Sequence, residues 1–191
     1  NAKIVTILPG SRTSEIIHHM LVLEKVVRLM AEKYKNIKFI IPTIENLASE
    51  IRKITAHWEQ KPIIVTQKSQ KILSYYSSNV AIAASGTVAL ELARVGLPFV
   101  VIYKISAITY FIVKFLIRAP NVCLINILAK RYDIVPELLQ EDCTAENIFR
   151  AVENVLSPKE SQRQKKSFHD VMKVLRSDPL KAAREVLNKI C

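Results

Sequence analysis

The chain has 191 residues, half of them hydrophobic, and a formal net charge of +11 at pH 7. This composition suits a packed domain and excludes a disordered chain, and no apolar run reaches the roughly 18–20 uncharged residues that span a bilayer. Three cysteines without a CxxC pair favour a reduced intracellular compartment, and four histidines without nearby acidic or cysteine partners argue against a metal site. The positive charge favours an anionic partner, such as a nucleotide or a membrane face, whereas the lack of zinc-finger, RNP-like and helix-turn-helix patterns disfavours nucleic acid.

The first hundred residues alternate between short apolar strands and helices. Residues 3–8 predict a strand, residues 9–12 a turn, and residues 14–33 a helix with apolar side chains at helical spacing. Further strands are expected at 38–41, 63–65, 80–84 and 99–103, and helices at 44–57, at 70–76 and from residue 88 until Gly96 and Pro98. Continuous apolar strands that alternate with helices predict a parallel sheet covered on both faces. We therefore expect an α/β, Rossmann-like, doubly wound domain.

The stretch 80–93 predicts an anion site. Five small or β-branched apolar residues are followed by Ser85, Gly86 and Thr87 and then by residues of helical composition. A strand that turns tightly into a helix directs backbone N–H groups and the positive end of the helix dipole at one point, which suits a phosphate. Gly86 permits close approach, and Thr87 can cap the helix or bind a phosphate oxygen. Glu91 lies about 6 Å further along the helix, where it can accept hydrogen bonds from a ribose. The alternative is a plain strand–turn–helix unit whose Glu91 points to solvent.

A second turn is expected to meet the first. In the usual strand order of such sheets, strands one and four are neighbours beside the switch point, so residues 9–12 and 85–87 would face one crevice. Arg12 can then pair with diphosphate oxygens and stabilise the charge on a departing nucleotide. The alternative is a solvated arginine near a helix start.

Residues 106–118 form the most hydrophobic segment, punctuated by Lys114 and Arg118. The segment fits either a buried helix or an interfacial patch that rests on a membrane. Residues 120–129 are expected to form a loop with a short extended piece. Residues 134–143 fit a ligand-contacting loop or a turn and helix start with Pro136 at the first helical position.

Helices follow to the end of the chain. Thr144 opens one helix that Ser157 and Pro158 end, residues 159–176 predict a basic helix, and Pro179 begins the last. We expect a nucleotide-sugar-binding domain over residues 1–156. The helices of residues 157–191 are expected to pack back on it, on another domain or on a partner subunit.

Four segments stand in a specific order and spacing. They are Leu8-Pro9-Gly10-Ser11-Arg12-x-x-Glu15, Ala84-Ser85-Gly86-Thr87-x-Ala89-Leu90-Glu91, Asn126-x-Leu128-Ala129 and Pro136-Glu137-Leu138-Leu139-Gln140-Glu141-Asp142-Cys143. Together they resemble the carboxyl-terminal half of the lipid A disaccharide synthases, a family of glycosyltransferases of Gram-negative bacteria. The resemblance runs over essentially the whole chain. A Ser-Gly-Thr turn alone is unspecific, because related nucleotide-sugar enzymes have similar turns.

The resemblance implies a GT-B fold, in which two Rossmann-like domains face each other across a cleft and this one holds the donor. The implied reaction transfers 2,3-diacylglucosamine from its UDP form, UDP-2,3-diacylglucosamine, to 2,3-diacylglucosamine 1-phosphate. It gives a β-1,6-linked disaccharide and UDP with inversion, and it needs neither metal nor cofactor. The implied nucleotide site is Gly10, Ser11, Arg12, Ser85, Gly86 and Thr87 at the diphosphate, Glu91 at the ribose, and Asn126, Glu137 and Gln140 by the uracil or sugar diphosphate.

The resemblance places the carboxylate base for the acceptor hydroxyl in an amino-terminal domain that this sequence does not contain. We nominate no acidic residue here as that base, and we expect the chain alone to bind UDP without transferring sugar. The first residue is Asn1 rather than Met, so we expect the sequence to begin inside a longer chain.

The resemblance also implies a cytoplasmic protein, peripheral at the inner membrane, because donor and acceptor carry acyl chains. That location agrees with a membrane patch at residues 106–118 beside a positive surface, and a homodimer is a further expected assembly. The alternatives are another UDP-sugar enzyme of GT-B shape, a nucleotide-binding module without chemistry, and a basic protein that binds membrane or nucleic acid.

Overall fold

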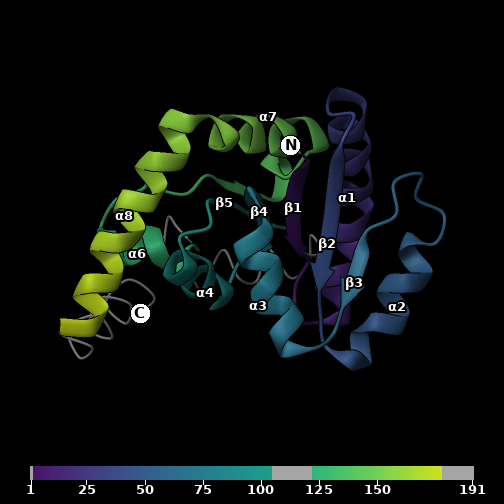
Figure 1. The fold of residues 1–191 in the computed structure, drawn as a ribbon, viewed down its shortest axis with the longest axis horizontal. Coiled ribbons are helices and arrows are strands. Elements are labelled where there is room, and N and C mark those ends of the chain that lie inside the picture. The colour runs from purple at the N-terminus through teal and green to yellow at the C-terminus, as the bar shows by residue number, and fades with distance from the viewer. Residues whose placement is uncertain (1, 105–121, 178–191) are drawn as a thin grey trace.

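The computed structural model describes residues 2–104 and 122–177. It shows one parallel sheet of six strands in the order β3-β2-β1-β4-β5-β6 (Figure 1). The strands are β1 (Lys3–Leu8), β2 (Ile37–Pro42), β3 (Ile63–Val65), β4 (Val80–Ala84), β5 (Phe99–Tyr103) and β6 (Glu137–Leu139). This is the strand order of the doubly wound dinucleotide-binding fold, with the switch point between β1 and β4. The expected α/β, Rossmann-like architecture is confirmed.

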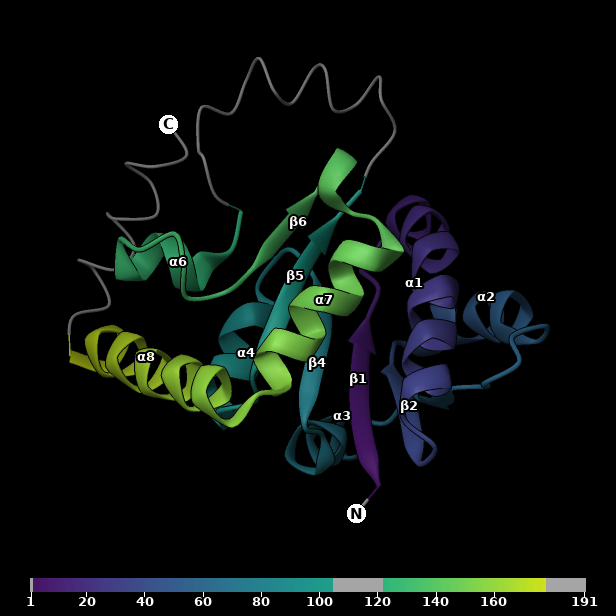
Figure 2. The same ribbon diagram turned by 90° about the horizontal axis from the view of Figure 1, so that it is seen from above.

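Helices cover both faces of the sheet (Figure 2). The described helices are α1 (Thr13–Lys33), α2 (Glu45–Thr55), α3 (Lys68–Ser77), α4 (Val88–Val95), α6 (Leu124–Ala129), α7 (Ala145–Leu156) and α8 (Pro158–Ser177), with a short 3₁₀ helix, η1 (Gln140–Asp142). On one face, α1 and α7 pack on the sheet with α2 beside them, and on the other lie α3, α4, α6 and α8.

Each strand feeds both cores because successive side chains point to opposite faces. In β4, Val80 and Ile82 join the core under α1 and α7, whereas Ala81 and Ala83 join the core under α4 and α8. The alanines permit close packing of α4, which begins directly after the turn that follows β4. The small-residue strand therefore sets where the amino end of α4 lies.

Two expectations about residues 120–143 are wrong. Residues 124–129 form the helix α6 rather than a loop, and Pro136 does not open a helix, because residues 137–139 form the sixth strand. The Pro136 carbonyl accepts a hydrogen bond from the N–H of Val101 at 2.8 Å, which continues the ladder between β5 and β6. Pairing with β5 decides the conformation there, and no local sequence pattern reveals such pairing.

The boundaries of the last helices are partly confirmed. The hydroxyl of Thr144 caps α7 by accepting from the N–H of Asn147 at 3.2 Å, as expected. Pro158 begins α8 rather than ending a helix. Proline fits the first helical position because the N–H it lacks would have no helical partner there.

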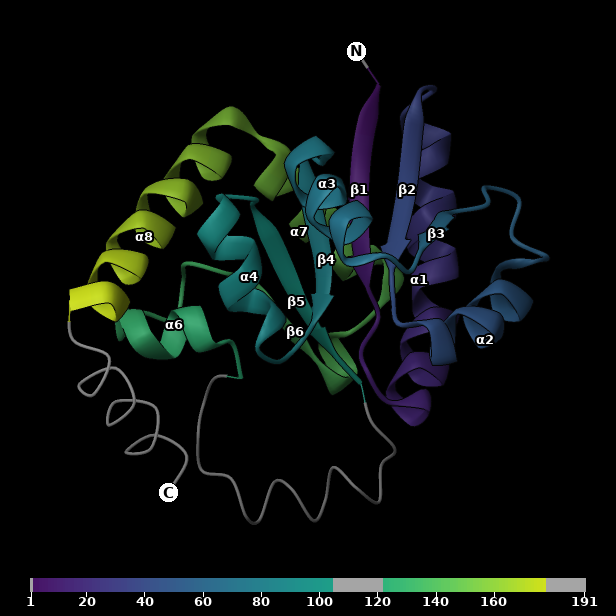
Figure 3. The ribbon, with the colours of Figure 1, turned by 60° about the horizontal axis from the view of Figure 1, so that its bottom comes forward.

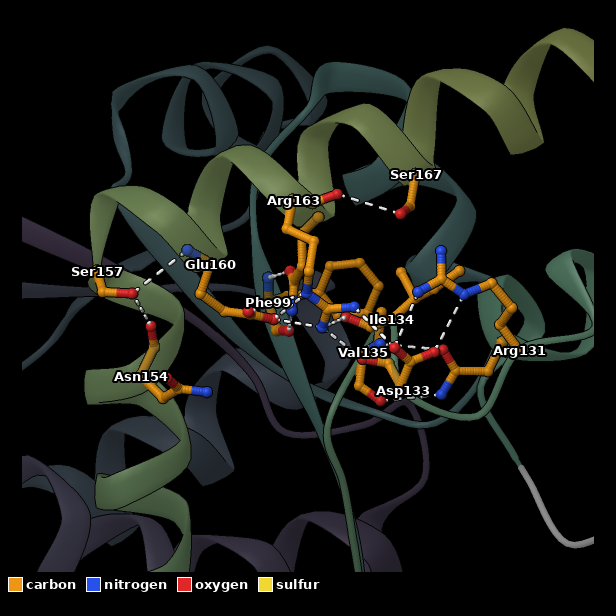
Figure 4. Close-up of polar contacts among 12 residues, drawn as sticks. Phe99, Arg131, Asp133, Ile134, Val135, Asn154, Ser157, Glu160, Arg163 and Ser167 are labelled. Carbon is orange, nitrogen blue, oxygen red and sulfur yellow. Dashed lines mark hydrogen bonds and ion pairs between the residues drawn. The ribbon is translucent and has the colours of Figure 1, made fainter.

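The described part of the carboxyl-terminal segment is attached to the sheet through α8. Gln164, fully buried, accepts from the N–H of Phe99 at 3.0 Å and donates to its carbonyl at 3.1 Å. Arg163 forms ion pairs with Asp133 and Glu160 (Figure 4). The division of the chain at residue 156 stays a prediction.

The hydrophobic segment 106–118 and the helix expected after Pro179 lie outside the described residues. Within the described ones, no helix is both long enough and apolar enough to cross a membrane.

Candidate functional site

A pocket of about 400 Å³ opens at the carboxyl edge of the sheet, between β1 and β4. Figure 3 shows β1 and β4 running in the same direction toward the edge where α1 begins. The predicted residues that line this pocket are Gly10, Ser11, Arg12, Ser85, Gly86, Thr87 and Glu91. The two turns that the sequence analysis expected to meet therefore do meet.

The first wall is the loop between β1 and α1. Gly10 has φ +123°, so a side chain there would be strained, and its Cβ would also lie 2.9 Å from Oε2 of Glu15 and displace that side chain. Glu15 also holds Arg12, with Nη1 3.2 Å from Oε1. The Arg12 side chain is 77% exposed while that of Glu15 is 13% exposed, so a nearly buried carboxylate orients a guanidinium at the pocket mouth.

The second wall is the turn between β4 and α4. Gly86 has φ +143°, which favours glycine. The N–H groups of Gly86, Thr87 and Val88 donate to no acceptor among the described residues, and all three residues line the pocket. Thr87 does not cap the helix with its side chain. Three open N–H groups at a helix start form the arrangement that binds phosphate oxygens.

Glu91 lies in the first turn of α4 and is paired from α3. Nζ of Lys71 lies 2.8 Å from Oε2 of Glu91, and the hydroxyl of Tyr75 donates to the same oxygen at 3.1 Å. Lys71 lines the pocket as well, although sequence reasoning did not select it. The sequence places Lys71 and Tyr75 one helical turn apart, but only the packing of α3 beside α4 shows that they face Glu91.

The charges of the pocket are balanced in pairs. Arg12 is paired with Glu15, and Lys71 is paired with Glu91, and all four residues line the pocket. Each cation is therefore held near the site before a ligand arrives, where it can also attract a phosphate. Among residues 2–104 and 122–177, no group of three His, Cys, Asp or Glu side chains lies together as a metal site would.

His19 joins the first loop to the end of β5. Its Nδ1 donates to the carbonyl of Pro9 at 2.7 Å, and its Nε2 accepts from the N–H of Lys104 at 2.9 Å. Burial lowers the pKa of His19 below its usual value of 6.5, and the bond to Pro9 only partly opposes this shift. The ring is therefore neutral and joins the ends of two strands. Its position on the apolar face of α1, beside Met20, is the signal that could have identified it.

Asn126 and Glu137 do not line the pocket but form a buried network with each other. Nδ2 of Asn126 donates to Oε1 of Glu137 at 2.7 Å, and Oε2 of Glu137 accepts from the N–H groups of Val122 at 2.7 Å and Cys123 at 3.2 Å. Asn126 also exchanges hydrogen bonds with both backbone groups of Val135. Burial raises the pKa of Glu137, although these hydrogen bonds oppose the shift. The network fastens the start of α6 to β6.

One hydrogen bond links this network to the pocket. The hydroxyl of Ser85 donates to the carbonyl of Val122 at 3.0 Å, and the N–H of Val122 donates to Glu137. Gln140 lies further along, buried in η1 with φ +47°. The structure thus brings seven of the ten predicted nucleotide-site residues into one pocket and leaves Asn126, Glu137 and Gln140 behind it.

The pocket also has a wall from β2 and α2 that sequence reasoning missed. Pro42, Thr43, Ile44 and Leu47 line it. The signal was available, because β2 neighbours β1 and the carboxyl ends of parallel strands share one edge.

Comparison with known proteins identifies relatives over the whole chain. A family model described as lipid-A-disaccharide synthetase matches residues 1–190. The lipid-A-disaccharide synthase of Bradyrhizobium diazoefficiens is 37% identical over 161 residues, which are 84% of this chain and 41% of that protein. The chain spans between 40% and 48% of the length of eight curated lipid-A-disaccharide synthases that it matches.

Solved structures share the fold at low sequence identity. The C-terminal domain of a group 1 glycosyl transferase (LpcC) from Francisella tularensis has a TM-score of 0.56 and 11% identity, covering 90% of this chain and 85% of that one. UDP-GlcNAc 2-epimerase from Neisseria meningitidis, solved with UDP-GlcNAc, also has a TM-score of 0.56, at 12% identity, covering 93% of this chain and 45% of that one. The structural neighbours include glycosyltransferases of GT-B fold, and at such low identity the likeness shows the fold alone. From the match over residues 1–190, the chain belongs to the lipid-A-disaccharide synthetase family.

Proposed function

We propose that this chain is the donor-binding half of a lipid A disaccharide synthase. The enzyme would transfer 2,3-diacylglucosamine from UDP-2,3-diacylglucosamine to 2,3-diacylglucosamine 1-phosphate, releasing UDP and forming a β-1,6-linked disaccharide. The observation that carries this proposal is the convergence of the Gly10–Arg12 loop and the Ser85–Thr87 turn on one pocket. Family membership supports the identity of the nucleotide sugar.

The diphosphate would lie between the two turns. The open N–H groups of Gly86, Thr87 and Val88 would receive phosphate oxygens, and Arg12 would approach from the opposite wall. As the bond between the sugar and the diphosphate breaks, negative charge grows on the departing UDP. A guanidinium already oriented by Glu15 stabilises that charge without reorganisation, so we assign Arg12 the role of leaving-group stabiliser.

Glu91 would accept a hydrogen bond from the ribose. It follows the phosphate-binding turn by one helical turn, which is the separation of a diphosphate from its ribose. We propose that Asn126, Glu137 and Gln140 shape the uracil and sugar-diphosphate side of the site. The bond from Ser85 to the Val122 carbonyl supports an indirect route for the first two, because Glu137 holds Val122.

We infer that the base for the acceptor hydroxyl comes from elsewhere in the enzyme. An inverting displacement needs a base on the face of the sugar opposite the departing nucleotide. The acidic residues in the pocket, Glu15 and Glu91, are paired with Arg12 and Lys71 on the nucleotide side. The 191-residue chain is therefore expected to bind UDP without forming disaccharide.

A peripheral place at the cytoplasmic face of the inner membrane belongs to the same proposal, as does a homodimer. Acylated substrates and a net charge of +11 favour an anionic membrane face. Replacing Phe111 and Phe115 by Ser is expected to lower binding to anionic liposomes. Unchanged liposome binding by the folded double variant would rule out residues 106–118 as the contact.

Calorimetric titration of the 191-residue chain with UDP tests the donor-binding role. Saturable binding is expected, with weaker binding of uridine because it lacks the diphosphate. Disaccharide formation is expected only when the amino-terminal half of a relative, such as the Bradyrhizobium diazoefficiens protein, is co-expressed. A chain that keeps its fold but binds no UDP at millimolar concentration would refute the proposal, and disaccharide made by the chain alone would refute the placement of the base.

A further inference from the structure

Two side chains of α3 hold Glu91 by a single oxygen. The Tyr75 hydroxyl donates to Oε2 at 3.1 Å, and Nζ of Lys71 lies 2.8 Å from that same oxygen. Within residues 2–104 and 122–177, no hydrogen bond reaches Oε1 of Glu91. The carboxylate therefore has one anchored oxygen and one with open lone pairs, on a residue that lines the pocket.

The two residues that hold Glu91, Tyr75 and Lys71, differ in how firmly their own side chains are fixed. Tyr75 is 3% exposed and packs in the core with Ala89 and Leu92, so packing fixes the place of its hydroxyl. Burial, and then the neighbouring Glu91, raise the pKa of Tyr75 well above its usual value of 10, so the hydroxyl keeps its proton and donates. Lys71 is partly exposed, and it offsets the charge of Glu91 in a pocket that must receive a diphosphate.

We propose that Tyr75 is a positioning residue that orients Glu91 so that its Oε1 accepts a hydrogen bond from a ribose hydroxyl of the bound nucleotide, while Lys71 balances the charge of Glu91 beside the diphosphate. The inference rests on the proposed function, because it takes the ligand to be a ribonucleotide. A glutamate side chain that is ordered before binding loses less rotamer entropy when the ligand arrives, and so binds more tightly. Tyr75 sets the direction of the carboxylate, and Lys71 sets the local charge.

The test compares UDP with 2′,3′-dideoxy-UDP, which lacks the ribose hydroxyls. Dissociation constants are measured by calorimetry for the full 191-residue chain and for Tyr75→Phe. Wild type is expected to prefer UDP by about tenfold, the size of one hydrogen bond to a charged group. Tyr75→Phe is expected to weaken UDP binding about fivefold and dideoxy-UDP binding less than twofold. The matched control is Tyr76→Phe on the same helix, because Tyr76 is 69% exposed, and it should leave both constants unchanged.

Lys71 is expected to act on both nucleotides alike. Lys71→Gln should weaken UDP and dideoxy-UDP by a similar factor of about ten, because both carry the diphosphate, and Lys71→Arg should restore most of the loss. Lys68→Gln on the same helix is the matched control, since Lys68 is exposed and does not line the pocket. A Lys71→Gln chain that binds UDP as tightly as wild type would overturn the role given to Lys71.

The ratio of the two constants separates positioning from mere structural support. The inference would be overturned if a folded Tyr75→Phe chain kept the wild-type preference for UDP, or if its affinity fell equally for UDP and dideoxy-UDP. Neither result would contradict the proposal that the wild-type chain binds UDP. Equal binding of both nucleotides by wild type would also overturn it, because Glu91 would then not read the ribose. Absence of UDP binding by wild type would instead refute the proposed function.

Discussion

Glu91 and Glu137 show how two regions of this molecule use the same side chain differently. At the pocket between β1 and β4, the Glu91 side chain is 48% exposed, and residues of the described ranges 2–104 and 122–177 engage only one of its oxygens. In the buried network between α6 and β6, formed by Asn126 and Glu137 with the backbone of residues 122, 123 and 135, both oxygens of Glu137 accept hydrogen bonds. One carboxylate has acceptor capacity left for a ligand, and the other is occupied by the fold.

This difference indicates which of the two glutamates stabilises the fold and which is available to bind a ligand. A partly buried carboxylate with both oxygens engaged keeps backbone N–H groups paired that would otherwise lack partners in a poorly hydrated place, so its loss is a loss of stability. A half-exposed carboxylate with one open oxygen contributes little to folding, because solvent screens its ion pair. Substitutions in the two regions should therefore separate cleanly into effects on unfolding and effects on nucleotide affinity.

The largest expected effect is on stability at Glu137. Glu137→Ala leaves the N–H groups of Val122 and Cys123 without their acceptor and removes one of the two acceptors of the Asn126 amide. It should lower the free energy of unfolding by about 3 kcal/mol. Urea denaturation followed by circular dichroism measures it. Glu141→Ala in η1 is the control, because Glu141 is exposed. A decrease in the free energy of unfolding of less than about 1 kcal/mol would show that the network of Asn126 and Glu137 does not hold α6 in place.

The next largest effect is on affinity at Arg12. Arg12→Ala removes the cation that faces the phosphate-binding turn, and should weaken UDP binding roughly tenfold to a hundredfold, with little change in stability because Arg12 is exposed. Calorimetry gives the affinity. Arg28→Ala on α1, the helix that follows Arg12, also changes an exposed member of an ion pair and should leave UDP binding unchanged. Equal affinity of Arg12→Ala and wild type would remove Arg12 from the proposed site.

A smaller effect is expected at His19, whose neutral ring joins the two strand ends. The unfolded chain takes up a proton near pH 6.5, whereas the folded chain does so only at lower pH because burial lowers the pKa of His19. The contribution of neutral His19 to the free energy of unfolding is therefore complete above about pH 6.5. It falls as the pH drops below that value, by at most about 1.4 kcal/mol per pH unit.

The measurement is urea denaturation at pH 7.5, 6.5 and 5.5. The groups that face His19 are Glu15, His18 and Lys104 with the ring of Tyr103. All of them are present in both wild type and the His19→Gln variant, so the difference between the two chains reports on His19. His19→Gln should flatten the dependence on pH, and His169→Gln, at an exposed site on α8, should not. If the free energy of unfolding of His19→Gln depends on pH as steeply as that of wild type, the pH dependence does not come from His19.

The smallest expected effect is on stability at Glu91. Glu91→Ala should lower the free energy of unfolding by no more than about 1 kcal/mol, because its partners are Lys71, which stays partly hydrated, and one hydroxyl. The same variant should weaken UDP binding about tenfold, so affinity changes where stability hardly does. A stability loss as large as that of Glu137→Ala would break the comparison between the two regions.

The sequence was informative wherever local chemistry decides conformation. The apolar runs at 3–8, 80–84 and 99–103 are too short and too β-branched for helices, and all three are strands. Thr144 caps its helix as its residue type predicts. The meeting of the two turns also followed from the sequence, because the strand order of such sheets places β1 beside β4.

Prediction failed where a partner distant in sequence decides conformation. Residues 124–129 contain Ile125, Asn126 and Ile127, a pattern without clear periodicity, and form a helix because Glu137 accepts hydrogen bonds at its start. Residues 137–139 are a strand because β5 offers an open edge. The sequence could not identify Lys71 and Tyr75 either, because their contact with Glu91 depends on which face of α3 packs against α4.

The sequence by itself determined that β1 lies beside β4, where the two turns lie, and which residue types there suit a phosphate, because periodicity and turn chemistry are local and topology follows a few rules. Only the tertiary structure decided which polar groups remain open. Counting the described residues, Glu91 keeps one free oxygen and Glu137 keeps none, although the two are the same amino acid. The reason is that hydrogen-bond capacity is consumed by neighbours that packing brings from far along the chain.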